Sequence, residues 1–211
     1  MARGFFIALE GGEGAGKSTQ AQRLAAHLRA AGHEVVLTRE PGGAPGAEEI
    51  RRLLVTGEPG RWSPLTEALL MYASRDDHLN VTIRPALARG AIVITDRFAD
   101  SSEAYQGAGG GVSLDTLNAL RSMVVGADEP DLTLIFDLPV ATGLARAAAR
   151  GGDDRFESKG AAYHQRLRDA YLAIAARRKD VAILIDAAQD EEAVAEAIRV
   201  RVDAALARRA G

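Results

Sequence analysis

The sequence predicts one α/β domain in which a doubly wound sheet of five parallel strands is surrounded by helices. Two observations predict this fold class: the chain contains five short apolar runs without clean polar alternation, and longer segments with helical spacing separate them. Strands buried on both faces have this character, and their alternation with helices favours a parallel sheet. The 211 residues suit one domain, 1–211, with a full hydrophobic core. The predicted strands are 5–9, 35–38, 91–95, 132–136 and 181–185.

Helices are expected between these strands, and turn-forming residues lie at their ends. Gly32 follows the first helical segment, Gly90 precedes the third strand, and Pro139 begins the helix after the fourth strand. Glycine-rich segments at 107–111 and 151–152 are expected to be loops, which can close over a site. The helical segments are 17–31, 46–56, 64–88, 114–125, 139–149, 160–178 and 190–209.

Composition and charge exclude several classes of function. The chain has no cysteine, which excludes disulfides and thiolate metal sites. With 26 basic and 29 acidic residues, it lacks the positive excess that binding to a nucleic-acid polymer usually requires. The apolar run near the N-terminus is followed at once by Glu10, so it is too short for a signal peptide or a membrane span. We therefore expect a cytoplasmic protein with no membrane or nucleic-acid partner.

A phosphate-binding loop follows the first predicted strand. Residues 11–18 match the spacing G-x-x-x-x-G-K-[ST] and lie between a strand and a helix, the context that this motif requires. Glycines let successive N–H groups point at one anion, and the following helix adds its positive N-terminal dipole. Lys17 is expected to reach the β- and γ-phosphates of ATP, and Ser18 to ligate Mg²⁺. The nucleotide-binding residues of the loop are then Gly11, Gly12, Glu13, Gly14, Ala15, Gly16, Lys17, Ser18 and Thr19.

A carboxylate at the end of a buried strand is the second expected metal ligand. Proteins with this loop hold Mg²⁺ at such a position, directly or through water. Asp96 ends the third strand and is the first candidate, because Arg97 beside it places positive charge at the same edge. Asp137 ends the fourth strand in the same way and is the second candidate.

Among nucleotide-binding proteins, a small kinase fits best. The chain has no N-K-x-D sequence to read guanine and no D-x-x-G switch, and it has no room for the extra domains of a motor or a helicase. A phosphate monoester acceptor is already a nucleophile at neutral pH, so arginines that hold two anions matter more than a general base. The four histidines are scattered, which favours surface or structural roles. Arginines at element ends are plentiful: Arg39, Arg51, Arg75, Arg97, Arg146, Arg150 and Arg155.

These residues resemble the thymidylate kinases, specifically the bacterial type, over nearly the whole chain. The resemblance rests on the loop just described and on further segments in order along the sequence. These are 38–43 (Thr-Arg-Glu-Pro-Gly-Gly), Asp96-Arg97-Phe98 with Ser101 and Ser102, 104–107 (Ala-Tyr-Gln-Gly), 130–133 (Pro-Asp-Leu-Thr) and Arg146 through 154–157 (Asp-Arg-Phe-Glu). The resemblance implies a fold of the P-loop NTPase type and transfer of a phosphoryl group from ATP to dTMP with Mg²⁺.

The resemblance also implies roles for the acceptor site. Glu13 is expected to accept a hydrogen bond from the sugar 3′-hydroxyl, Arg97 to hold the acceptor phosphate, and Tyr105 to pack where a ribose 2′-hydroxyl would sit. The implied substrate-binding residues are Glu13, Glu40, Pro41, Arg51, Met71, Arg75, Arg97, Ser101, Ser102, Tyr105 and Gln106, with Arg51 aiding Arg97, Pro41 shaping the pocket floor and Arg75 facing the thymine edge. The implied catalytic residues are Lys17, Arg97, Arg150, Arg155 and Glu13.

Two positions depart from common patterns of the family. Gly14 stands where the eukaryotic type has an arginine, so charge on the transferring phosphoryl group must be stabilised from elsewhere. A short lid at about 146–157 resembles the segment that supplies this positive charge in the bacterial type. Arg150 and Arg155 are favoured for stabilising the transferring phosphoryl group, and Arg146 is the next candidate. Arg146 and Arg150 are also expected to bind the nucleotide. Met71 stands where a phenylalanine usually stacks on thymine.

Two alternatives stay open: the same fold acting on another nucleoside monophosphate, and a catalytically weak ATP-binding regulator. The resemblance also implies a homodimer built on helices. The apolar segment 64–88 could take part, although the same apolar stripe would equally serve as core.

Overall fold

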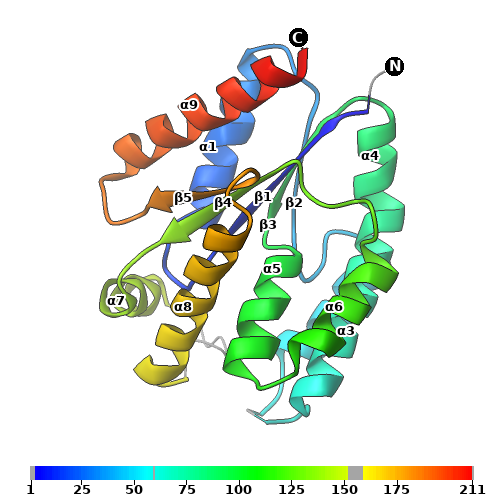
Figure 1. Ribbon diagram of the computed structural model, residues 1–211, viewed down its shortest axis with the longest axis vertical. Helices are drawn as coiled ribbons and strands as arrows, with labels where there is room; N and C mark the ends of the chain where they lie inside the picture. Colours follow the sequence, from blue (N-terminus) through cyan, green and yellow to red (C-terminus); the bar gives the residue numbers. More distant parts are fainter. Residues whose placement is uncertain (1–2, 59, 152–158, 211) are drawn as a thin grey trace.

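The computed structural model describes residues 3–58, 60–151 and 159–210. Its centre is a five-stranded parallel sheet with the order β2-β3-β1-β4-β5, as Figure 1 shows. The sheet confirms the predicted fold class. Its strands are β1 (Phe5–Gly11), β2 (Val35–Arg39), β3 (Ile92–Asp96), β4 (Leu132–Asp137) and β5 (Ala182–Asp186).

The helices cover both faces of the sheet (Figure 1). On one face lie α1 (Lys17–Ala30) and α9 (Glu191–Ala210), and on the other lie α4 (Arg84–Ala88), α5 (Ala99–Ser102) and α8 (Ala161–Arg177). The remaining helices are α2 (Pro45–Val55), α3 (Pro64–His78), α6 (Leu114–Val124) and α7 (Val140–Arg150), with the π-helical segments η1 (Leu79–Ile83) and η2 (Glu103–Gly109).

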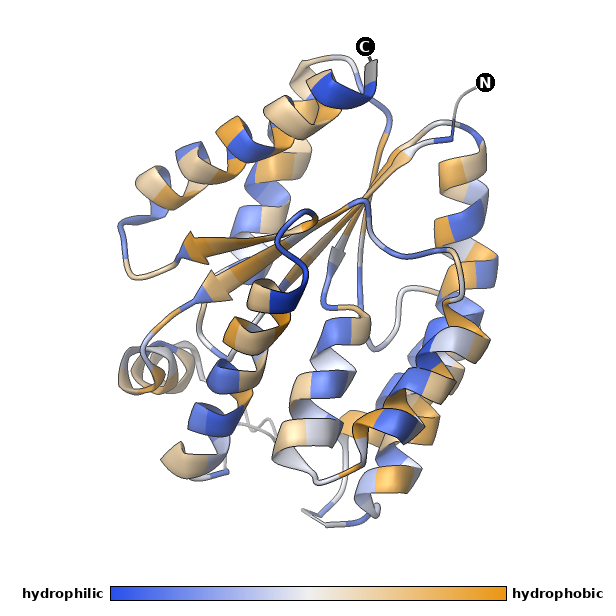
Figure 2. Ribbon diagram, in the orientation of Figure 1, coloured by the Kyte–Doolittle hydropathy of each residue, from blue (hydrophilic) through white to orange (hydrophobic). Residues whose placement is uncertain are grey.

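Strand β1 explains why the apolar runs do not alternate with polar residues. Phe5, Ile7 and Leu9 belong to the core beneath α1 and α9, whereas Phe6 and Ala8 belong to the core on the opposite face. Because helices cover both faces, each apolar side chain of β1 enters a core, and Figure 2 shows the strands coloured hydrophobic over most of their length. Burial on both faces therefore follows directly from the sequence pattern.

The predicted helix 64–88 is interrupted, and a further helical segment was not predicted. Helix α3 passes through η1 into α4, so 64–88 is helical but contains a π-helical turn. The segment 107–111 was expected to be a loop, but η2 extends to Gly109. A Cβ at Gly107 would meet the Leu117 side chain at 3.0 Å, and one at Gly109 would lie 2.6 Å from the Tyr163 ring. These glycines permit close helix packing, and the prediction of a loop was wrong for 107–109, whereas 110 and 111 lie outside the helical segment.

Candidate active site

The loop after β1 closes on itself around Lys17. Gly14 and Gly16 have φ angles of 68° and 83°, a left-handed conformation that favours glycine. Lys17 Nζ donates to the carbonyl oxygens of Gly11 and Gly12 at 3.0 and 2.8 Å. Burial, together with the charge of Arg97, lowers the pKa of Lys17 to about 8. The lysine is therefore poised inside the loop, where an anion with several phosphates would stabilise its charge.

Ser18 and Asp96 come together from two different elements. Ser18 in the first turn of α1 donates its hydroxyl to Asp96 Oδ2 at 2.5 Å, and Asp96 ends β3. A hydroxyl and a carboxylate are oxygen ligands of the kind that Mg²⁺ prefers. The donor set therefore fits this ion, and both predicted metal ligands lie at one edge of the sheet. Within the described residues, no group of three or more His, Cys, Asp or Glu side chains could hold a metal.

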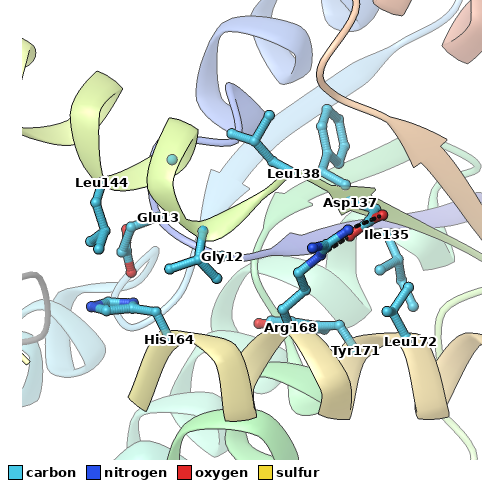
Figure 3. Close-up of a pocket in the computed structure, with 13 residues that line it drawn as sticks. Gly12, Glu13, Ile135, Asp137, Leu138, Leu144, His164, Arg168, Tyr171 and Leu172 are labelled. Carbon is cyan, nitrogen blue, oxygen red and sulfur yellow. Dashed lines mark hydrogen bonds and ion pairs between the residues drawn. The ribbon is translucent and has the colours of Figure 1, made fainter. Parts of the chain in front are cut away.

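The second metal candidate, Asp137, is already paired. Arg168 of α8 donates from Nε and Nη2 to the two carboxylate oxygens of Asp137 at 2.7 and 3.0 Å (Figure 3). This pair borders a separate cavity of about 30 Å³ that Glu13 and His164 also line. The geometry thus favours Asp96 over Asp137 as the partner of Ser18.

Glu13 joins the phosphate loop to the segment after β3. Its Oε1 accepts from Arg97 Nη2 at 2.7 Å and from the Tyr105 hydroxyl at 2.6 Å. Burial alone would raise the pKa of Glu13, but the charges of Arg97 and Lys17 and the Tyr105 hydrogen bond lower it to about 2. The carboxylate is therefore charged at neutral pH and fixed by two partners.

Arg97 occupies a backbone conformation that non-glycine residues seldom adopt. Its φ is 74°, and such a residue costs on the order of 1–3 kcal/mol, which structures retain mainly at functional sites. Its guanidinium also donates to the Gly11 carbonyl at 3.0 Å and lies over the Tyr105 ring, 4.8 Å from the centroid. The strained turn thus presents the guanidinium next to the phosphate loop.

The buried carboxylate of Glu10 accepts hydrogen bonds from the turn that follows β3. Its Oε1 accepts from the backbone N–H groups of Phe98 and Ser101 at 2.9 and 3.1 Å, and Oε2 accepts from the hydroxyls of Ser101 and Tyr171 at 2.6 and 3.2 Å. Burial and the charge of Asp100 raise the pKa of Glu10 to about 7. This acid lies on β1 directly before the phosphate loop, but only the three-dimensional structure shows which residues it supports.

Arg75 forms the far wall of the site. Its side chain is 2% exposed, yet it lines the cleft. Its Nε donates to Glu40 Oε2 at 2.8 Å, Nη1 donates to Ser102 Oγ at 3.2 Å and Nη2 donates to the Phe98 carbonyl at 3.0 Å. The Glu40 carboxylate also contacts His78 Nδ1 at 3.1 Å. Hydrogen bonds to Glu40, Ser102 and Phe98 therefore fix the orientation of the guanidinium.

One cleft with a volume of about 440 Å³ connects these groups. It extends from the phosphate loop to the wall at Arg75, and every residue predicted to bind the acceptor lines it. Its lining residues are Glu13, Gly14, Ala15, Gly16, Lys17, Ser18, Thr19, Arg39, Glu40, Pro41, Arg51, Val55, Met71, Arg75, Asp96, Arg97, Phe98, Ser101, Ser102, Tyr105 and Gln106.

Among the described residues, no arginine of the predicted lid lines this cleft. Arg146 of α7 donates to the carbonyl of Ala187, after β5, at 3.0 Å and is not among the residues that line the cleft. Arg150 is the last residue of α7, and Arg155 lies outside the described residues. The roles predicted for these arginines remain predictions.

Four buried residues support the wall of the cleft, and the sequence did not indicate this role for any of them. Glu10, Glu67, His78 and Tyr171 all pair with residues of the cleft wall. The sequence offered only a weak indication of these residues: Glu67 and His78 are polar residues on the buried side of helix α3. Their partners lie 30 or more positions away along the chain, so local patterns could not identify them.

The chain is similar to known proteins over most of its length. The family model described as thymidylate kinase matches residues 9–198. A thymidylate kinase of Caulobacter vibrioides is 61% identical over 198 residues, covering 94% of this chain and 95% of that protein. One from Pseudomonas fluorescens is 58% identical over 186 residues, covering 88% and 89%.

A solved structure extends the likeness to three dimensions. The crystal structure of thymidylate kinase from Ehrlichia chaffeensis matches with a TM-score of 0.75 and 33% sequence identity, covering 94% of this chain and 98% of that one. The family model, the identities and the shared architecture agree with the resemblance seen in the sequence. This chain belongs to the thymidylate kinase family.

Proposed function

We propose that this protein transfers the γ-phosphoryl group of ATP to dTMP, giving ADP and dTDP. The observation that carries the proposal is that one cleft is lined both by the phosphate loop, with Lys17, and by the arginines proposed to bind the acceptor, Arg97 and Arg75. An oxygen of the acceptor phosphate attacks the γ-phosphorus, and the bond to the β-phosphate bridging oxygen breaks. The monoester is ionised near neutral pH, so no general base is needed.

The donor end would bind ATP through the backbone N–H groups of the loop and through Lys17. Ser18 and Asp96 would hold Mg²⁺, which neutralises charge between the β- and γ-phosphates when bound. The 2.5 Å contact between their side chains supports this assignment because it places both oxygens at one point. Gly14 has no side chain that could stabilise the transferring phosphoryl group, so Arg146, Arg150 and Arg155 of the lid are proposed to supply this positive charge.

The acceptor end would bind dTMP through groups that are already ordered. Arg97 and Arg51 are proposed to hold the phosphate, Glu13 the sugar 3′-hydroxyl, and Arg75 the base. Arg51 Nη1 donates to the carbonyl of Pro41 at 2.8 Å, which fixes it at the cleft floor. Met71, partly buried at the wall, would pack on the base ring through its thioether.

The test is an ADP-release assay with MgATP against dTMP, dUMP, dCMP, dGMP, UMP and AMP. Turnover of dTMP far above the others is expected. Turnover mainly with another monophosphate would contradict the acceptor and retain the phosphate chemistry. Folded protein that binds ATP but turns over none of them would favour the regulator alternative.

We further propose a cytoplasmic homodimer. No helix in residues 3–58, 60–151 or 159–210 has the length and apolar character to cross a bilayer. Leu65 and Leu69 of α3 are 47% and 50% exposed, and Leu114 of α6 is 50% exposed. Exposed apolar side chains on two helices that pack together suit an interface between copies. Light scattering after size exclusion checks the assembly: a mass near 22.3 kDa would contradict the dimer.

A further inference from the structure

Glu67 of α3 and Gln106 of η2 form a buried pair behind one wall of the cleft. Gln106 Nε2 donates to Glu67 Oε1 at 2.8 Å, and the two residues are 1% and 6% exposed. Gln106 lines the cleft, whereas Glu67 is not among the lining residues of the described chain. The pair thus links a group that can touch a ligand to one that supports it from behind.

The chemistry of Glu67 decides which way the Gln106 amide faces. A carboxylate only accepts hydrogen bonds, so the amide must turn its nitrogen, and not its oxygen, towards Glu67. The reversed amide would set two acceptors against each other in a buried place, which is strongly unfavourable. The acceptor oxygen Oε1 of Gln106 is therefore the part of the amide that remains for a ligand in the cleft.

Arg75 contributes the opposite polarity to the same wall. Its guanidinium has five N–H groups and no acceptor, and Glu40, Phe98 and Ser102 take the Nε, Nη2 and one Nη1 donor. Within the described residues, a second N–H of Nη1 has no partner and is available to a ligand. Ser102, which accepts from Arg75 Nη1, is four residues from Gln106 on the helical segment that runs from α5 into η2. The donor of Arg75 and the acceptor of Gln106 therefore lie near each other at the cleft.

We propose that Glu67 is a specificity-determining positioning residue, which sets the Gln106 amide so that the wall offers an acceptor beside the donor of Arg75. This arrangement matches a pyrimidine whose ring N–H neighbours a carbonyl oxygen, as in thymine and uracil. Cytosine presents an unprotonated ring nitrogen beside an amino group, so both contacts would be mismatched. The inference rests on the proposed function, because it takes the acceptor base to lie against this wall.

Glu67→Gln tests the proposal because a glutamine is nearly isosteric and can donate. Its amide nitrogen can donate to Gln106 Oε1, which allows the Gln106 amide to turn and present N–H groups to the cleft. The ratio of kcat/KM for dTMP to that for dCMP is expected to fall roughly 10- to 100-fold, the usual effect of an unmatched polar pair. The value for dUMP should fall with that for dTMP, since the two bases share this edge.

Gln106→Met separates positioning from general packing. It removes the amide, so the dTMP/dCMP ratio should fall in this variant, and adding Glu67→Gln to it should change the ratio no further. Glu103→Gln is the matched control: Glu103 lies on η2, pairs with Arg177 at 2.5 Å and is not among the described residues that line the cleft. Its ratio should stay within twofold of the wild-type value.

The outcomes separate this proposal from the proposed function. A ratio within twofold of wild type in Glu67→Gln, equal losses for dTMP and dCMP, or an unchanged ratio in Gln106→Met would each overturn the positioning role alone. If Glu67→Gln does not fold, Gln106→Met decides by itself. Wild-type protein that turns over none of the pyrimidine monophosphates would overturn the proposed function and this assignment together.

Discussion

Glu13 and Arg97 form an ion pair of 2.7 Å that joins the phosphate loop to the turn after β3. Their side chains are only 13% and 17% exposed, so solvent screens the pair weakly. Both residues line the cleft, and both are proposed to contact the acceptor. If these two residues bind the acceptor as proposed, their pairing orders that part of the site before a ligand binds and limits the reorganisation that the reaction requires.

Replacing Arg97 should impair the acceptor step more than ATP binding. A positioned arginine contributes about 10³-fold or more in phosphoryl transfer, so Arg97→Met is expected to lower kcat/KM for dTMP by about that factor. Arg97→Lys should lose less, because it keeps the charge but not the forked geometry. Steady-state kinetics and a separate ATP-binding titration check this, with Arg201→Met on the exposed side of α9 as the control. Equal losses at positions 97 and 201 would contradict the role.

Shortening Tyr105 should relax the choice of sugar. Its ring lies beside Arg97 and its hydroxyl donates to Glu13 at 2.6 Å, so it borders the proposed sugar position. Tyr105→Ala is expected to raise turnover of the ribonucleotide relative to dTMP by at least about tenfold, because space for a 2′-hydroxyl opens. Tyr105→Phe keeps the ring and should keep the discrimination. A deoxy-to-ribo ratio of kcat/KM that stays constant in the alanine variant would show that another group excludes the hydroxyl.

Glu10 should make stability depend on pH. Its pKa of about 7 lies above the ordinary 4.5, so between these values the folded protein holds a proton that the unfolded chain has released. This contribution to the free energy of unfolding is full below pH 4.5 and is lost as the pH rises through 7. Relative to Glu10→Gln, which cannot titrate there, the wild type should lose on the order of 3 kcal/mol over that range.

Urea unfolding at several pH values measures this difference. Glu196→Gln is the control, because its carboxylate is 61% exposed on α9. A wild-type curve that runs parallel to that of Glu10→Gln from pH 4.5 to 7 would mean that burial does not hold the proton at Glu10.

The elements that the sequence predicted are those whose signals are local. Each strand is a short apolar run because helices cover both faces, and the phosphate loop is a continuous motif whose glycines adopt left-handed conformations. The segment after β3 was missed because Gly107 and Gly109 indicate a loop when they are considered alone. Their small size instead serves contacts with α6 and α8, which are distant in sequence. Tertiary packing decided the conformation there.

The site divides in the same way. Most residues that line the cleft could be named from motifs and from the family resemblance, although Val55 could not, and every residue predicted to bind the acceptor lines this one cavity. The supporting partners could not be named: Glu67 acts through Gln106, and His78 through Glu40, across 39 and 38 positions of sequence. Such pairs exist only once α3 lies against η2 and the segment after β2.

Gly109 should prove to be a packing residue. A Cβ there would lie 2.6 Å from the Tyr163 ring, so Gly109→Ala must displace either η2 or α8. Overpacking of this kind costs about 1–3 kcal/mol of the free energy of unfolding, even though alanine is the better helix former. Gly160→Ala is the matched control, because φ is −60° at Gly160 and no atom lies within 4 Å of the added Cβ.

Urea denaturation of both variants measures the difference. The control should stay within about 0.5 kcal/mol of wild type. Tyr163→Leu should recover part of the loss in the Gly109→Ala background, because it removes the ring that the added methyl group meets. If Gly109→Ala is as stable as the control, η2 tolerates a side chain at this point. Chain flexibility, and not contact with α8, would then be the reason for a glycine at position 109.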